Sequence, residues 1–73
     1  MFTETQLKAK ELKLDINSIV DCVNPRYKNV ACSVAKKAES IVNFADMRGH
    51  ALEDELVTLE DIKAKVMRMR MYS

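Results

Sequence analysis

One stretch decides the fold: residues 24–49, NPRYKNVACSVAKKAESIVNFADMRG. Asn24 is a favourable N-cap, because its side-chain oxygen can accept a hydrogen bond from a free backbone N–H at a helix start. Pro25 fits the first helical position, where no backbone N–H is needed. Gly49 can adopt the left-handed conformation that ends many helices. Because no other Gly or Pro lies between them, we expect one long helix over 25–48.

One face of this predicted helix is apolar and rich in alanine. At about 100° per residue, the face carries Tyr27, Val30, Ala31, Val34, Ala35, Ala38, Ile41, Val42 and Ala45. Polar side chains lie opposite. Small side chains allow a neighbouring helix to approach closely, toward the lower end of the usual ~8–10 Å spacing. We therefore expect tight packing against another helix.

A helix is also predicted before this stretch, over about 3–23. Thr3 and Gln6 have the spacing of a capping box. The apolar stripe consists of Ala9, Leu12, Ile16, Ile19, Val20 and Val23. The helix ends before Pro25, because the residue preceding a proline disfavours helical geometry. A connection this short favours an antiparallel helical hairpin, although a sharper angle between the two helices stays open.

A third helix is predicted over about 59–71, after the acidic connector 50–57. Thr58 and Asp61 repeat the spacing of Thr3 and Gln6, so Thr58 is the expected N-cap. The connector is predicted as a loop or a short turn of helix. The stripe of the third helix consists of Leu59, Ile62, Val66 and Met69. We therefore predict an all-α fold in which this helix lies across or beyond the hairpin.

Length and composition favour a single helical domain over residues 1–73. The apolar content of 48% is too high for a disordered chain. A net charge of +1 gives the molecule as a whole no strong preference for nucleic acid or membrane. A chain this short makes most of its core where helices meet, so a partner subunit would add stability.

The expected location is the cytoplasm. No apolar run approaches the ~18–20 residues that span a bilayer, and the N-terminus lacks the basic and apolar regions of a secretory signal. Cys22 and Cys32 do not form a CxxC pair, which agrees with a reducing compartment. Free thiols are favoured, and a disulfide between the two cysteines stays open.

The sequence offers little for catalysis or metal binding. The single histidine, His50, lies in the acidic connector, and no serine or cysteine has an evident base near it in sequence. There is no glycine-rich phosphate loop. Cys22, Cys32 and His50 lack the spacing of zinc ligands. We therefore expect no enzyme, no metal and no cofactor.

The start of helix 25–48 is the clearest candidate for a ligand site. Free N–H groups and the positive end of the helix dipole attract anions. Arg26, Tyr27 and Lys28 stand beside these groups and add two cations and a ring on which a base could stack. The alternative is that Tyr27 packs into the hairpin while both cations are solvated.

Some apolar residues lie off the predicted core stripes: Leu7 and Leu14 in the first helix, and Met67 and Met71 in the third. The seven-residue spacing of the two leucines is typical of a helix–helix seam, and methionine suits adaptable interfaces. These four residues predict a contact with a second subunit or another protein. The alternative is that they are scattered surface side chains.

The third helix carries basic residues with no acid among them, at Lys63, Lys65, Arg68 and Arg70. Cations suit the C-terminal end of a helix, so a solvated helix end is the favoured interpretation. Binding to an anion or an acidic partner is the second. Insertion into a DNA groove is the weakest, because the preceding connector is acidic.

A further pattern lies in 26–48. A short turn between two helices is followed first by an arginine, then by an alanine and a serine two positions apart, and then by further alanine and asparagine residues. The residues are Arg26, Ala31, Ser33, Ala38, Asn43 and Ala45. In these positions the segment resembles the helical-hairpin domain of phage anti-CBASS sponge proteins. Those proteins sequester the cyclic oligonucleotide signals of bacterial defence.

The resemblance implies a non-enzymatic homo-oligomer that binds cyclic oligonucleotides between subunits, with Arg26 and Ser33 at the ligand. Lys36 and Lys37 stand where the family has an acidic pair, and Phe44 is the aromatic residue nearest to the family's tryptophan position.

Two functions follow as hypotheses. The first is a phage-type sponge for cyclic oligonucleotides, with the ligand bound by Arg26, Tyr27, Lys28 and Ser33. The alternative is a protein–protein interaction module, or an inhibitor that docks on a host protein through its exposed Leu and Met side chains.

Overall fold

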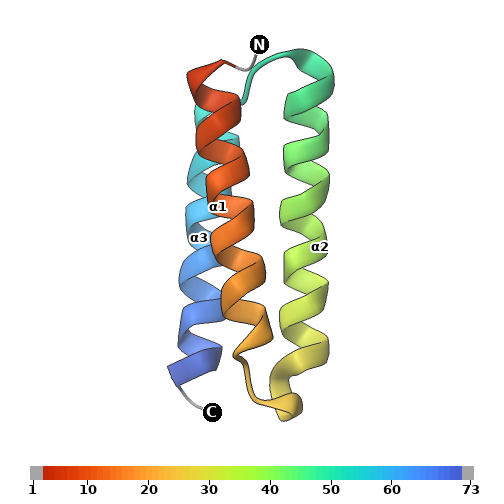
Figure 1. The fold of residues 1–73 in the computed structure, drawn as a ribbon, viewed down its shortest axis with the longest axis vertical. Helices are drawn as coiled ribbons and strands as arrows, with labels where there is room; N and C mark the ends of the chain where they lie inside the picture. Colours follow the sequence, from red (N-terminus) through yellow and green to blue (C-terminus); the bar gives the residue numbers. More distant parts are fainter. Residues whose placement is uncertain (1–2, 72–73) are drawn as a thin grey trace.

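The computed structural model describes residues 3–71, which form three helices (Figure 1). They are α1 (Glu4–Asp21), α2 (Pro25–Arg48) and α3 (Glu53–Met71). No strand occurs in this part of the chain. The all-α prediction is therefore confirmed.

The helices form a three-helix bundle. α1 and α2 run antiparallel, and α3 runs alongside both in the direction of α1 (Figure 1). The principal extents of the molecule are 38 × 19 × 15 Å, so the helices lie along one long axis. The hairpin is confirmed, whereas the third helix lies along it and not across or beyond it.

The predicted capping box begins α1. The backbone N–H of Gln6 donates to Oγ1 of Thr3 at 3.3 Å, and the backbone N–H of Thr3 donates to Oε1 of Gln6 at 2.8 Å. Each side chain thus satisfies a backbone donor that has no partner within the helix.

Both ends of α2 lie where the sequence places them. Oδ1 of Asn24 accepts the backbone N–H of Arg26 at 2.9 Å, and Pro25 is the first helical residue. At the other end Gly49 has a φ of 95°, and its N–H donates to the carbonyl of Ala45 at 2.9 Å. This left-handed conformation favours glycine.

α3 begins earlier than predicted, at Glu53 and not at Leu59. The backbone N–H of Leu52 donates to the carboxylate of Glu55 at 2.9 Å, and the N–H of Leu56 donates to the carbonyl of Leu52 at 3.0 Å. Leu52 therefore occupies the N-cap position, while Glu55 supplies the return bond of a capping box.

The prediction of Thr58 as an N-cap was wrong, because this residue lies inside α3. Its hydroxyl donates to the backbone carbonyl of Asp54 at 2.8 Å, a bond that Thr commonly makes within helices. The acidic residues 53–55 form the first turn of α3, where the positive end of the helix dipole favours negative charge. They therefore stabilise a helix that begins at Glu53. Most of the predicted connector is therefore helical.

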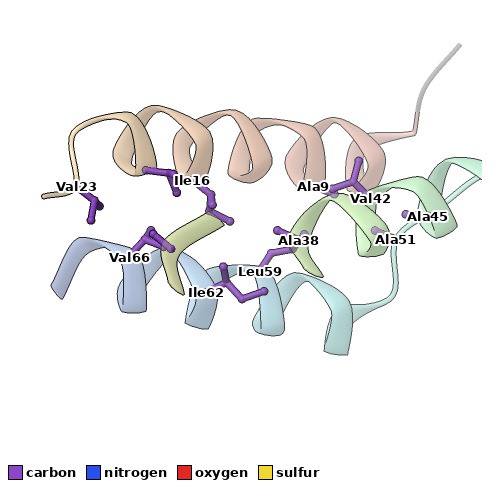
Figure 2. Close-up of a cluster of buried hydrophobic side chains, with 12 residues drawn as sticks. Ala9, Ile16, Val23, Ala38, Val42, Ala45, Ala51, Leu59, Ile62 and Val66 are labelled. Atoms are coloured by element: carbon purple, nitrogen blue, oxygen red, sulfur yellow. The ribbon is translucent and has the colours of Figure 1, made fainter. Parts of the chain in front are cut away.

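The core is built around the alanine face of α2 (Figure 2). Ala31, Ala38 and Ala45 are buried, and so are the large side chains of Ile16 in α1 and Leu59 in α3. Small residues on α2 leave room for large residues from the two neighbouring helices, which allows the helices to approach closely.

Val30 departs from the predicted apolar face of α2. Its side chain is 54% exposed, whereas Ala31 is fully buried and Val34 is partly buried. The part of the α2 surface that α1 and α3 cover is narrower than the apolar face that the sequence predicts. The prediction that Val30 is buried was therefore wrong.

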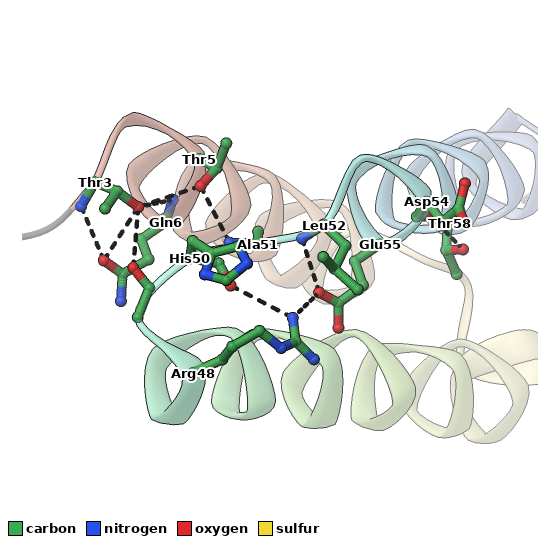
Figure 3. A network of polar contacts seen from close by, with 11 residues as sticks. Thr3, Thr5, Gln6, Arg48, His50, Ala51, Leu52, Asp54, Glu55 and Thr58 are labelled. Carbon is green, nitrogen blue, oxygen red and sulfur yellow. Dashed lines mark hydrogen bonds and ion pairs between the residues drawn. The ribbon is translucent and has the colours of Figure 1, made fainter.

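Polar contacts fasten the start of α1 to the end of α2 and to the connection that follows it (Figure 3). Oγ1 of Thr5 accepts the backbone N–H of Ala51 at 3.1 Å. Gln6 is buried and donates through Nε2 to the carboxylate of Asp46 at 3.5 Å, and Lys10 forms an ion pair with the same carboxylate at 3.6 Å. These contacts hold one end of the bundle in a fixed arrangement.

Candidate functional site

The four predicted ligand residues lie in the first part of α2 but do not converge on one point. Arg26 and Ser33 are exposed, and their seven-residue spacing puts them on one helix face. Tyr27 packs against the core. Lys28 donates through Nζ to the backbone carbonyl of Asp21 at 3.4 Å, at the end of α1. The structure therefore leaves Arg26 and Ser33 exposed on one face of α2, about two turns apart, and directs Tyr27 and Lys28 elsewhere.

The N-terminus of α2 is capped by its own chain. The N–H of Arg26 donates to the side chain of Asn24, and the N–H of Tyr27 donates to the carbonyl of Asn24, both at 2.9 Å. Pro25 has no N–H to offer. An anion at this end of the bundle would consequently be bound by side chains and not by these backbone groups.

Positive charge gathers at this end of the bundle from two helices. Because α2 and α3 are antiparallel, the start of α2 lies at the same end as the last turns of α3 (Figure 1). Arg26 and Arg68 are both exposed there. Arg68 lines a shallow pocket of about 280 Å³ together with Asp61, Ala64 and Lys65. This end of the molecule can attract an anionic group.

The four predicted interface residues are exposed but do not form one surface. Leu7 and Leu14 lie on α1, and the exposed fraction is 54% for Leu7 and 65% for Leu14. Leu14 borders a shallow pocket between α1 and α2. Met67 and Met71 are also exposed but lie in the last turns of α3, at the end of the bundle opposite Leu7 (Figure 1).

Further large apolar side chains are exposed that the sequence did not single out for an interface. They are Val30, Phe44, Met47, Leu52 and Val57. The helical spacing of Phe44 and Met47 could have identified them, because both fall off the alanine face of α2. Val57 could not be identified in this way, since the predicted helix began after it.

Among the residues that the structure describes, Glu55 has a side-chain pKa that the fold clearly shifts. The hydrogen bond from the guanidinium of Arg48 lowers the pKa of Glu55 from its ordinary value of 4.5, the N–H of Leu52 lowers it further, and burial opposes both. This carboxylate fixes the α2–α3 connection and does not border any of the pockets described above. Cys22 and Cys32 are free and exposed.

Within residues 3–71, no group of three or more His, Cys, Asp or Glu side chains is placed to hold a metal ion. None of the helices in the same range is long and apolar enough to cross a bilayer. Comparison of the chain with models of protein families, with curated proteins and with solved structures finds no match.

Proposed function

We propose that this protein is a non-enzymatic interaction module that binds a helix of a partner protein through the outer face of α1. The observation that carries the proposal is the exposure of Leu7 and Leu14, both of which are more than half exposed. The inner face of α1 is already filled by Ile16 and Val20, so its own core does not use these leucines. Two leucines seven residues apart fit the apolar stripe of a partner helix.

The surroundings of Leu14 indicate what kind of helix fits. Leu14 borders a pocket of about 250 Å³ with Lys10, Lys13, Val42 and Asp46. Lys10 is already paired with Asp46. An apolar side chain of the partner can enter this pocket while acidic side chains beside it approach Lys13. An amphipathic helix with acidic flanks, supplied by a partner protein, therefore suits this surface.

A photo-cross-linking amino acid at position 14 tests the proposal in the cells that make the protein. We expect irradiation to give one discrete adduct with a partner protein, and we expect Leu7→Glu to abolish it. The matched control places the same amino acid at Ser40, which is exposed on α2, and should not give that adduct. Identical adducts from positions 14 and 40, or no effect of Leu7→Glu, would contradict the proposal.

A second candidate function is the sequestration of a cyclic oligonucleotide by a homo-oligomer. Its support is the exposure of Arg26 and Ser33 on one face of α2, with Arg68 at the same end of the bundle. Guanidinium groups are well suited to phosphate oxygens. Titration calorimetry with cyclic di- and trinucleotides tests it: binding should weaken in Arg26→Ala and not in the control Lys36→Ala. No heat across the panel would remove this candidate.

A further inference from the structure

A groove between α2 and α3 forms a surface that is separate from the one around Leu7 and Leu14 on α1. The groove has a volume of about 300 Å³ and is lined by Val34, Lys37, Ile41, Thr58, Asp61, Ile62 and Lys65. Each helix contributes one edge, and the two edges differ in chemistry.

The α2 edge is an apolar stripe with a charge at its centre. It comprises Val30, Val34, Lys37, Ile41 and Phe44, whose alternating four- and three-residue spacing keeps them on one helix face. Val30 and Phe44 are 54% and 61% exposed, and each is seven residues from Lys37. The bundle therefore leaves both ends of this stripe uncovered.

The α3 edge has the same spacing but is polar. It comprises Asp54, Thr58, Asp61, Lys65 and Arg68, so its first half is acidic and its second half is basic. Asp54 and Arg68 are exposed, and each is seven residues from Asp61. A charge pattern that reverses along a helix is complementary to its own copy in the opposite direction.

We propose that this face binds a second copy of the chain in an antiparallel dimer with two-fold symmetry. A symmetric dimer uses the same patch on both subunits. In the antiparallel arrangement α2 faces α2 and α3 faces α3. Val30 of each subunit then lies opposite Phe44 of the second copy, and Asp54 lies opposite Arg68 of the second copy.

The chemistry of the two edges selects the antiparallel dimer over the parallel one. With the helices parallel, two-fold symmetry would place α2 against α3 of the second copy. The apolar side chains of Val30 and Phe44 would then bury the charges of Asp54 and Arg68 without partners, which is costly. Away from the two-fold axis, the antiparallel dimer pairs apolar side chains with apolar ones and acid with base.

The antiparallel dimer brings like charges together at its centre and at its rim, and opposite charges lie beside both. At the two-fold axis Lys37 lies opposite Lys37 of the second copy, and Asp61 lies opposite Asp61. Because Lys37 and Asp61 of one subunit line the same groove, opposite charges lie beside each of these like-charged pairs. At the rim, Arg26 approaches Arg48 of the second copy, but the guanidinium of Arg48 is already paired with Glu55. The like charges at the rim are therefore partly neutralised.

Sedimentation equilibrium at several protein concentrations tests the dimer. Asp54→Arg and Arg68→Asp each create like-charge contacts at both symmetry-related sites, so each should raise the dimer Kd by about tenfold or more. The double variant should regain wild-type affinity, and a mixture of the two single variants should form a heterodimer of wild-type affinity. Lys36→Asp is the control, because it makes the same charge change as Arg68→Asp outside the groove.

A wild-type protein that stays monomeric at every concentration would overturn the dimer. So would a double variant that associates no better than the two single variants. The substituted residues are exposed, and circular dichroism of each variant verifies that the helices are retained. The outcome is independent of the cross-link at Leu14, because Leu14 lies on α1 outside the α2–α3 groove. The dimer and the proposed function can therefore fail separately.

Discussion

Arg48, in the last turn of α2, donates to the carboxylate of Glu55, in the first turn of α3 (Figure 3). The same carboxylate accepts the backbone N–H of Leu52 at 2.9 Å. One side chain therefore both closes the connection between two helices and caps the second of them.

Glu55→Gln should lower the free energy of unfolding at pH 7 by about 1 kcal/mol. The amide can still accept one hydrogen bond, but the charge that Arg48 pairs with is lost. Urea denaturation monitored by circular dichroism measures the change. Glu60→Gln serves as the control, because Glu60 is exposed on α3 and should change the stability little. An equal effect of both substitutions would contradict the capping role of Glu55.

The stabilisation by Glu55 should depend on pH in a defined direction. The fold lowers the pKa of this carboxyl below 4.5, so its contribution is complete above the unfolded pKa and is lost as the pH falls through the folded pKa. The difference in unfolding free energy between the wild type and Glu55→Gln should thus be constant above about pH 5.5 and shrink below about pH 4.5. A difference that grows on acidification would reverse the assigned direction.

Thr58→Ala should leave the stability unchanged or raise it by a few tenths of a kcal/mol, up to about 0.5 kcal/mol. Thr58 lies inside α3, where alanine is the better helix former, and its hydroxyl bonds a carbonyl of the preceding turn. If Thr58 were an N-cap, the same substitution would cost about 1 kcal/mol. Thermal denaturation distinguishes the two, with Thr3→Ala as the variant that should lose a true cap.

Gly49→Ala should destabilise the protein by about 1–2 kcal/mol. An added Cβ would have no atom within 4 Å, so the cost comes from the left-handed backbone, with its φ of 95°, and not from a clash. Gly49→Asn should cost less, because asparagine tolerates this conformation better. Equal stabilities of the alanine and asparagine variants, measured in urea, would contradict this explanation.

Ala38→Leu should destabilise the protein by about 1–3 kcal/mol, because the added atoms have no space between the three helices. Ala38 is 1% exposed and lies in the middle of the alanine face. Ser40→Leu introduces the same side chain at an exposed position of α2 and should have little effect. If both variants unfold at the same urea concentration as the wild type, the close approach of the helices is not as described.

Local signals made α1 and α2 predictable. The ends of α2 depend on Asn24, Pro25 and Gly49, and each of these residues acts through its own backbone or side chain without help from the tertiary structure. The start of α3 was not predictable by the same means, because two capping patterns compete there. Glu55 caps the helix instead of Thr58, because Arg48 from the last turn of α2 also binds the Glu55 carboxylate.

The candidate sites were less predictable than the helices. Sequence spacing identified Leu7 and Leu14 as outward residues, since it needs only the helical period. The same spacing placed Tyr27 on the apolar face of α2, but it did not decide between packing of Tyr27 against the core, which the structure shows, and a ligand site around Tyr27. Nor could it show that the two edges of the α2–α3 groove lie side by side, because that depends on the course of α3 along the hairpin.

The parallel course of α1 and α3 has a consequence for synthesis on the ribosome. The side chains of Ile16 and Leu59 are both fully buried, yet Leu59 belongs to α3, which is translated after α1 and α2. A nascent chain that ends after α2 lacks the residues that complete this core. Stable folding should therefore wait for α3, and a fragment that stops at Arg48 should be sensitive to proteases.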